Sequence, residues 1–179
     1  MTHTAAELTN AVWKELVRAT HDKHHEWRVP ALASVGLDGW PQARTVVLRH
    51  ADPTTHQLHI YTDRRSPKVG ELLLRPEATL VFWSRRKSWQ LRVQVRVAVE
   101  QSGKAVEAAW LRVSQTAAAS DYLAEQPPGA PLGQSGTALP SHQLAVLVAQ
   151  VQTMDWLELS RSGHRRARID PSGLTWLTP

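Results

Sequence analysis

The sequence predicts a mainly antiparallel β-protein, in which one sheet closes into a barrel and a few helices lie at its periphery. The chain has 179 residues and a hydrophobic content of 42%, which suits a single domain with one sizeable core. From residue 30 onward, short alternating segments separated by turn residues outnumber the helical segments. Closing such a sheet removes its exposed edges, which favours a barrel. We therefore expect one domain over residues 1–179.

The first 27 residues predict a helix followed by a polar connector. Leu8, Val12 and Leu16 recur at helical spacing within residues 5–18, so one face of this helix is apolar. Residues 20–26 contain three histidines, and a metal site is one interpretation of them. These histidines lack a ligand partner at a defined helical spacing, so we favour a connector and predict no metal site.

The rest of the chain alternates as strands do, with turn residues at 36–39, 52–55, 162–163 and 170–173. Residues 89–100 alternate most strictly, and their polar face carries Gln and Arg, so it either lines a ligand or subunit interface or faces water. We expect a three-stranded meander at 31–35, 42–50 and 57–62, and further strands at 79–84, 89–100, 144–152, 155–160, 165–169 and 174–177.

Three more helical segments are expected, at residues 68–74, 104–118 and 121–126. Ser66 is expected to cap the first of them, with Pro67 at its first position, where a missing N–H costs nothing. Residues 126–140 are rich in Pro and Gly and predict a loop, which is either a lid or a connector.

Composition restricts the location and the partners. The chain has no cysteine, so disulfides and thiolate metal sites are excluded. It has no signal-peptide pattern at its start and no apolar stretch of about 18 residues, so we expect a cytoplasmic protein that is not in a membrane. A net charge of +5 raises nucleic acid as a partner. Because the basic residues form separate clusters at 64–68, 85–87 and 161–168, we consider nucleic acid unlikely and keep a phosphorylated small molecule as the alternative.

Four short segments carry residue types that bind a phosphate and a flat ring. They are Arg-Thr-Val-Val-Leu-Arg at 44–49, Tyr-Thr at 61–62, Ser-Pro-Lys at 66–68 and Trp-Gln-Leu at 89–91. A phosphomonoester is held by fixed cations and hydroxyls beside a helix N-terminus. Arg44, Ser66 and Lys68 are the predicted phosphate ligands. The competing interpretations are strand-edge charges for the arginines and plain helix capping for Ser66.

At these segments the chain resembles the pyridoxamine 5′-phosphate oxidase family of FMN-binding split barrels. The resemblance runs from about residue 30 to the C-terminus and is strongest at residues 44–97. It implies an FMN-binding split β-barrel with FMN as cofactor. Side chains at 44, 46 and 48 share one face of their strand, and the Val46 and Val47 backbone is expected at the flavin ring. The implied cofactor-binding residues are Arg44, Thr45, Val46, Val47, Arg49, Tyr61, Thr62, Ser66, Lys68, Gln90, Trp156 and Arg168.

The resemblance further implies a homodimer with FMN at the interface and hydride transfer between a small-molecule substrate and the flavin. Several family residues are replaced: Pro67 stands for an Arg, the Tyr, Arg and Ser that hold the substrate phosphate have no counterparts around residues 110–120, and residues 166–167 lack the active-site His. We therefore expect an FMN-dependent oxidoreductase with a substrate other than pyridoxamine phosphate, and assign no catalytic residue. The alternatives are a non-catalytic flavin- or haem-binding protein and, for Trp156, a core position.

Overall fold

The computed structural model describes residues 4–132 and 141–179. Part of the expected loop at 126–140 therefore lies outside the described residues. The described strands form one nine-stranded sheet with the order β2-β1-β5-β6-β7-β4-β3, while β8 pairs with β7 and β9 with β8. The strands are β1 Ala31–Val35, β2 Pro41–Thr45, β3 Leu48–Asp52, β4 Gln57–Asp63, β5 Glu77–Ser84, β6 Trp89–Glu100, β7 Leu144–Glu158, β8 Arg165–Asp170 and β9 Gly173–Leu177.

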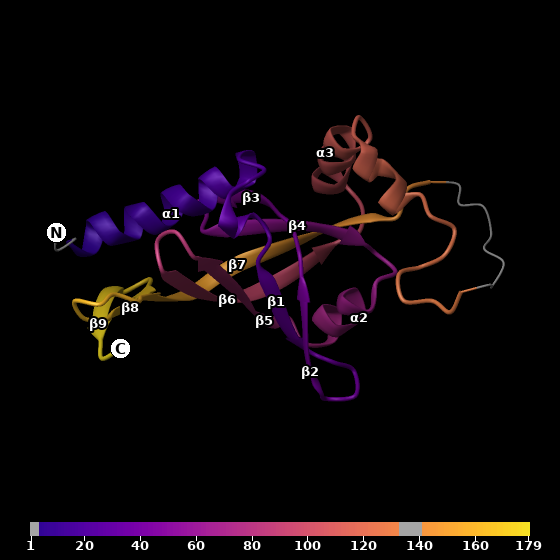
Figure 1. Ribbon diagram of the computed structural model, residues 1–179. Coiled ribbons are helices and arrows are strands. Elements are labelled where there is room, and N and C mark those ends of the chain that lie inside the picture. Colours follow the sequence, from indigo (N-terminus) through magenta and orange to yellow (C-terminus); the bar gives the residue numbers. More distant parts are fainter. Residues whose placement is uncertain (1–3, 133–140) are drawn as a thin grey trace.

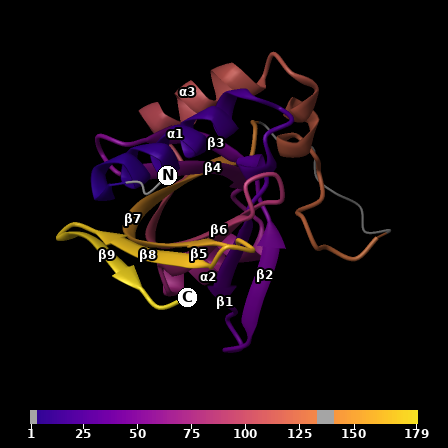
Figure 2. The same cartoon turned by 60° about the vertical axis from the view of Figure 1, so that its left-hand side comes forward.

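The segment from β2 to β3 closes the barrel. These two strands are consecutive in the chain, yet they stand at opposite ends of the strand order, since β2 pairs with β1 and β3 pairs with β4. The predicted single strand at 42–50 and its three-stranded meander are therefore wrong. The chain leaves one sheet edge at Val46, whose N–H donates to the Pro30 carbonyl (3.0 Å), and joins the other edge at Leu48. Figure 2 shows the strands curling around the barrel.

Residues 144–158 form one long strand where the sequence predicts two. Val151 pairs with Val95 and Thr153 with Gln94, so Gln152 is an extra residue on β7. Such a β-bulge bends a strand and breaks its alternation. The alternation pattern therefore predicts a break, although the backbone continues across the bulge.

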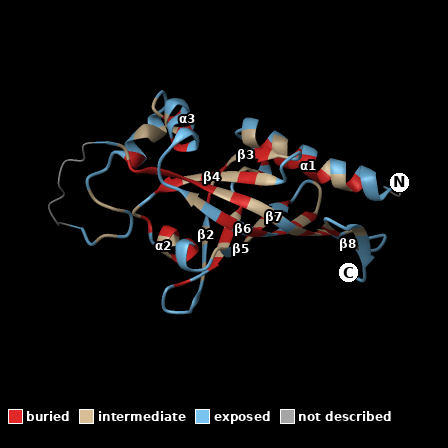
Figure 3. Ribbon diagram, turned by 180° about the vertical axis from the view of Figure 1, so that it is seen from behind, coloured by how far each residue is buried: buried red, intermediate tan, exposed pale blue. Residues whose placement is uncertain are grey.

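The helices cover the barrel at different places (Figure 1). Helix α1 (Ala5–His21) buries Leu8, Val12 and Leu16 completely, as its spacing predicts, and packs against β3. Helix α2 (Pro67–Leu74) packs against β1 and β6. The burial pattern follows this arrangement, with buried positions along the strands and exposed ones on the outer side of the helices (Figure 3). No helix among the described residues is long and apolar enough to cross a membrane.

Helix α3 (Lys104–Val113) is shorter than predicted, and the 3₁₀-helix η2 (Ala117–Tyr122) replaces the segment expected at 121–126. The Ser114 hydroxyl donates to the Leu111 carbonyl (3.3 Å) and the Thr116 hydroxyl to the Val113 carbonyl (2.8 Å). Hydroxyls that bond nearby carbonyls compete with the helical pattern, which accounts for the early end of α3.

A second 3₁₀-helix, η1 (Glu26–Arg28), follows the histidine-rich connector. His25 is buried there, where its Nε2 lies 2.9 Å from a Glu15 carboxylate oxygen and its Nδ1 accepts from the Trp27 N–H. This histidine therefore fastens the connector to α1.

Candidate functional site

Lys68 is held between two buried hydroxyls at the start of α2. Its ammonium donates to the Ser66 hydroxyl (2.6 Å) and to the hydroxyl of Thr62 (3.1 Å), a residue near the end of β4. The side chain of Ser66 makes no bond to the helix backbone, so its predicted role as a side-chain cap is wrong. Pro67 does occupy the first turn, as expected. A lysine ammonium has three donors, so one remains for a ligand.

Arg44 reaches the same end of α2 from β2. Its guanidinium donates to the Ser34 hydroxyl and to Oε2 of Glu71 (2.8 Å). Ser34 also donates to that carboxylate oxygen (2.6 Å). Since Glu71 is buried and the Arg44 side chain is 22% exposed, the arginine is fixed by partners on β1 and α2 and does not extend freely from a strand edge.

Ser34 and Glu71 are not among the residues that the sequence motifs indicate. A glutamate three residues after Lys68 lies on nearly the same side of a helix, so Glu71 had a detectable signal. Ser34 had none, because its approach to Arg44 depends on the register of β1 and β2.

The Lys68 cluster, which we define as Arg44, Thr62, Ser66, Lys68 and Glu71, has more cations than carboxylates. Burial lowers the pKa of Lys68, and the neighbouring Arg44 lowers it further, while Glu71 opposes the shift. Asp63 lies close by, but Arg65 binds its carboxylate from the side chain and the backbone. Two fixed cations, two hydroxyls and a free ammonium donor suit an anion such as a phosphomonoester.

A second positively charged site contains Arg49 on β3 and Tyr61 on β4. The Arg49 guanidinium lies over the Tyr61 ring, 5.8 Å from its centre. Together with Arg28 and Arg112, these residues line a cleft of about 180 Å³, which we call the arginine cleft. Arg28 donates to the carbonyls of Ala19 and Thr20 at the end of α1, and no ion pair joins any of the three arginines to a carboxylate in the described residues.

Thr45 ends β2, and Val46 and Val47 form the bend between β2 and β3. Thr45 is exposed and Val46 is buried. The Val46 N–H already donates to Pro30, so this group is not available to the flavin ring. The other backbone groups of Val46 and Val47 remain for the expected contact with the flavin ring.

The last three predicted residues lie elsewhere on the sheet. Thr62 of the Lys68 cluster pairs with Ala145 on β7, next to the residue that pairs with Glu100 at the end of β6. Gln90 lies near the start of β6, and Arg168 on β8 is joined through Asp155 to Arg92 of β6. Gln90 and Arg92 precede Glu100 by ten and eight residues, which corresponds to about 33 and 26 Å along a strand. One chain therefore does not bring Gln90 and Arg168 to the Lys68 cluster.

Trp156 is a core residue. Its side chain is completely buried, and its ring centre lies 5.2 Å from that of Trp89 and 6.3 Å from that of Trp176. A side chain with no exposed surface cannot contact a cofactor bound outside the core. The expected flavin contact of Trp156 therefore disagrees with this structure, whereas the core alternative describes its position.

Part of the chain matches a known protein family and several curated proteins. Residues 10–101 match the family model described as pyridoxamine 5′-phosphate oxidase, FMN-binding domain. A pyridoxine/pyridoxamine 5′-phosphate oxidase from Thermosynechococcus vestitus is 39% identical over 90 residues, which are 50% of this chain and 38% of that protein. A similarly named protein from Arabidopsis thaliana is 35% identical over 94 residues, which are 50% of this chain and 46% of that protein. The chain thus spans less than half the length of these relatives.

Two solved structures share the fold over nearly the whole chain. A pyridoxamine 5′-phosphate oxidase-related, FMN-binding protein from Nostoc punctiforme has a TM-score of 0.74 at 22% identity and covers 95% of this chain and 96% of its own. PhzG from Burkholderia lata, in complex with tetrahydrophenazine-1-carboxylic acid, has a TM-score of 0.69 at 18% identity. The match covers 96% of this chain and 90% of the PhzG chain. The matched family model spans the segments that carry the predicted phosphate ligands. The chain belongs to the pyridoxamine 5′-phosphate oxidase FMN-binding domain family, its fold is the FMN-binding split barrel, and its cofactor is FMN.

Proposed function

We propose that this protein is a homodimeric, cytoplasmic FMN-dependent oxidoreductase that acts on a small anionic molecule other than pyridoxamine phosphate. The observation that carries the proposal is the Lys68 cluster, where an ammonium fixed by two buried hydroxyls lies beside Arg44 at the start of α2. This donor set has the charge and the hydrogen-bond donors that a flavin phosphate requires.

Each residue of the cluster has a distinct role in this proposal. Arg44, Ser66, Thr62 and Lys68 hold the phosphate, and Glu71 acts as a positioning residue by fixing the Arg44 guanidinium. Bound FMN would supply the capacity to accept or donate a hydride. Arg49, on the strand that follows Arg44, provides positive charge near the polar side of the ring.

The arginine cleft supports an anionic substrate. Arg28, Arg49 and Arg112 come from three different elements and converge on one small space without a carboxylate partner among the described residues. Arg28 and Arg49 keep hydrogen bonds to the α1 carbonyls and to Tyr122, but their charges are not neutralised by a carboxylate of the described residues. Guanidinium groups of this kind bind carboxylates and phosphates by paired hydrogen bonds. This cleft would take over the task of the family's substrate-phosphate residues, which the chain lacks. That PhzG binds a carboxylic acid agrees with an anionic substrate in this fold.

The separation of the predicted site residues supports a homodimer. Gln90 and Arg168 lie on the outer face of the sheet, far from the Lys68 cluster of the same chain. Large apolar side chains are exposed on this face, among them Trp83 (46%) and Leu177 (38%). A second copy packed on this face would cover them and bring Gln90 and Arg168 to a cofactor held by its partner. An exposed apolar face of this kind is typical of an interaction surface.

Reduction of the bound flavin tests the catalytic part of the proposal. The purified holoprotein is mixed without oxygen with nicotinamide nucleotides, pyridoxamine phosphate and planar aromatic carboxylates, and the flavin absorbance near 450 nm is followed. We expect bleaching by at least one anionic compound other than pyridoxamine phosphate, and none by pyridoxamine phosphate or by the neutral amide of an active carboxylate. A flavin that stays oxidised with all of them favours the alternative of a non-catalytic flavin-binding protein.

A further inference from the structure

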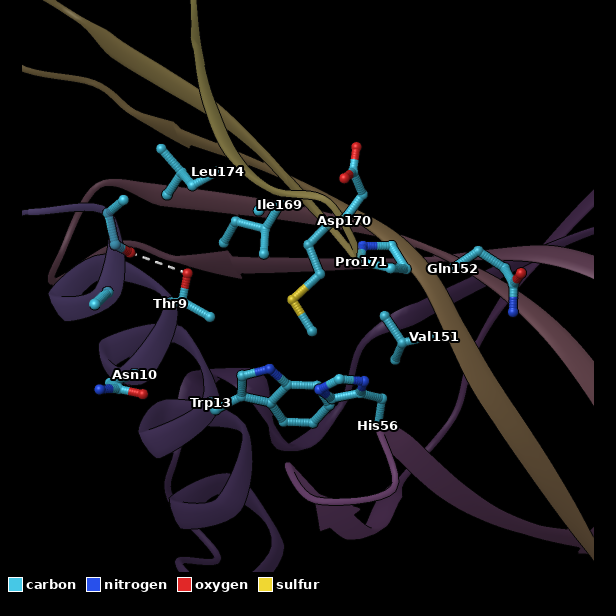
Figure 4. A pocket seen from close by; sticks show the side chains of 14 residues that line it. Thr9, Asn10, Trp13, His56, Val151, Gln152, Ile169, Asp170, Pro171 and Leu174 are labelled. Atoms are coloured by element: carbon cyan, nitrogen blue, oxygen red, sulfur yellow. Dashed lines mark hydrogen bonds between the residues drawn. The ribbon is translucent and has the colours of Figure 1, made fainter.

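A second cavity lies at the other end of the barrel from α2. It has a volume of about 420 Å³ and lies between α1, the turn before β4, the bulged part of β7 and the β8–β9 hairpin (Figure 4). It shares no residue with the Lys68 cluster or the arginine cleft. The cavity therefore has no part in the function proposed above.

Two irregular backbone features shape this cavity. The extra residue Gln152 lies on its wall, and bulges redirect side chains next to binding sites. His56 has a φ of 54°, a left-handed conformation that is unfavourable for a residue with a side chain. Its carbonyl accepts from the Val151 N–H (2.9 Å), which fixes this conformation. Strain of this kind often occurs at functional sites.

The fixed backbone of His56 places its imidazole against Trp13. The two rings are stacked, with their centres 5.6 Å apart and their planes 24° from parallel. Figure 4 shows them together at one side of the cavity, with the indole nitrogen of Trp13 on the edge that faces the space. The remaining wall is mainly apolar and includes Val151, Met154, Ile169, Pro171 and Leu174.

The polar groups of the cavity define the ligand further. The Thr9 hydroxyl donates to the Ala5 carbonyl (3.0 Å), and the Asp170 carboxylate accepts from Ser172 and pairs with Arg168. The Trp13 indole N–H has no hydrogen-bond partner in the described residues. No hydrogen bond joins the His56 imidazole or the exposed Asn10 amide to another described residue either. A mainly apolar space with an aromatic side and an indole donor matches an uncharged, flat ligand that carries an acceptor.

We propose that this cavity binds a small, neutral, planar heteroaromatic molecule, which contacts the Trp13–His56 pair and accepts a hydrogen bond from the Trp13 indole. Its volume lies at the lower end of the range for ligand pockets, roughly 300–1,000 Å³. A molecule of one or two rings is therefore the expected size.

The test follows the indole N–H signals of the holoprotein by ¹H–¹⁵N NMR while quinoline is added as the probe. The chain has eight tryptophans, so the other indoles serve as internal controls, and Trp13→Phe identifies the Trp13 signal. We expect a saturable shift of the Trp13 signal, with the Trp40 and Trp83 signals unaffected and the flavin absorbance unchanged. Naphthalene, which lacks the acceptor, should bind about tenfold more weakly.

Two variants make the test specific. Ala6→Phe fills the cavity from α1 and should weaken quinoline binding at least about tenfold, whereas Lys14→Phe adds the same ring outside the cavity and should leave binding unchanged. His56→Gly removes the imidazole without adding strain, since glycine tolerates this φ, and should weaken binding without loss of folding. A Trp13 signal that does not shift saturably, or that shifts equally in Ala6→Phe, overturns the proposal.

Discussion

The guanidinium of Arg44 and the carboxylate of Glu71 lie 2.8 Å apart, between the strand that begins the barrel closure and the helix that carries Lys68. This pair connects β2 to α2, two elements that are separated in the chain but both contribute to the Lys68 cluster. It leaves the cluster with a buried acceptor for Arg44 and an ammonium whose last donor is free. The pair therefore gives the proposed phosphate site its shape.

Removal of the Glu71 carboxylate should destabilise the protein. In Glu71→Leu, Arg44 and Ser34 both lose a buried acceptor, and we expect the free energy of unfolding to fall by about 2–3 kcal/mol. Urea denaturation of the protein without cofactor measures the change. Glu77→Leu is the matched control, because Glu77 is an exposed partner of Arg96 and should cost less than about 1 kcal/mol. If the free energy of unfolding falls equally in both variants, the buried Arg44–Glu71 pair stabilises the protein no more than an exposed pair does.

The lowered pKa of Lys68 predicts how stability depends on pH. Between the lowered folded-state pKa and the usual value of 10.5, the unfolded chain binds the proton that the folded chain has released. Stability of the protein without cofactor should therefore rise with pH in this window, and Lys68→Met should remove the rise. Thermal denaturation at several alkaline pH values tests it, with Lys14→Met as the control. If stability still rises with pH in Lys68→Met, another titrating group causes the rise.

FMN affinity should show the opposite dependence on pH. A phosphate beside Lys68 favours the protonated ammonium, so FMN affinity should fall as pH rises through the same window. Fluorescence titration of FMN at each pH measures this, and Lys68→Met should show a flat profile at lower affinity. An identical slope in the variant would mean that Lys68 does not face the phosphate.

The arginine cleft should bind anions even when the flavin is in place. Inorganic phosphate added to the holoprotein should show broadened ³¹P signals, and Arg112→Gln should weaken its binding about tenfold, as expected for the loss of one charge-assisted contact. FMN content should not change. Arg161→Gln is the control, since Arg161 is exposed in the turn between β7 and β8 and does not line the cleft. Equal weakening in both variants would indicate a general charge effect in place of a cleft.

Disruption of the outer sheet face should separate the subunits. Trp83→Glu places a charge in the proposed interface, so we expect a monomer that has lost most of its FMN. Sedimentation velocity and flavin absorbance measure both effects. Trp40→Glu, at the more exposed Trp40 (72%) in the β1–β2 turn, should remain dimeric. A wild-type protein that sediments as a monomer with full FMN content would contradict the dimer.

Local patterns predicted the elements that depend on a few neighbouring residues. The apolar face of α1, the alternation of β6 and the Pro67 start of α2 are predicted correctly because each is set by short-range periodicity or backbone chemistry. Local patterns do not predict the division of residues 42–50 between two sheet edges or the continuity of β7 across Gln152, because barrel closure and a bulge decide them. Likewise the motif indicates Lys68 and Arg44 as cations, and helical spacing places Glu71 near Lys68, whereas the contact of Ser34 with Arg44 depends on the register of β1 and β2.

The comparison of FMN with riboflavin, which lacks the phosphate, tests the central claim most directly. Fluorescence titration of the cofactor-free protein should give an affinity for FMN at least about 100-fold higher than for riboflavin, since several charge-assisted hydrogen bonds hold the phosphate. Lys68→Met should reduce this ratio by about tenfold or more through FMN alone and leave riboflavin binding unchanged. Equal affinities for FMN and riboflavin in the wild-type protein, or a ratio that Lys68→Met does not alter, would contradict the account.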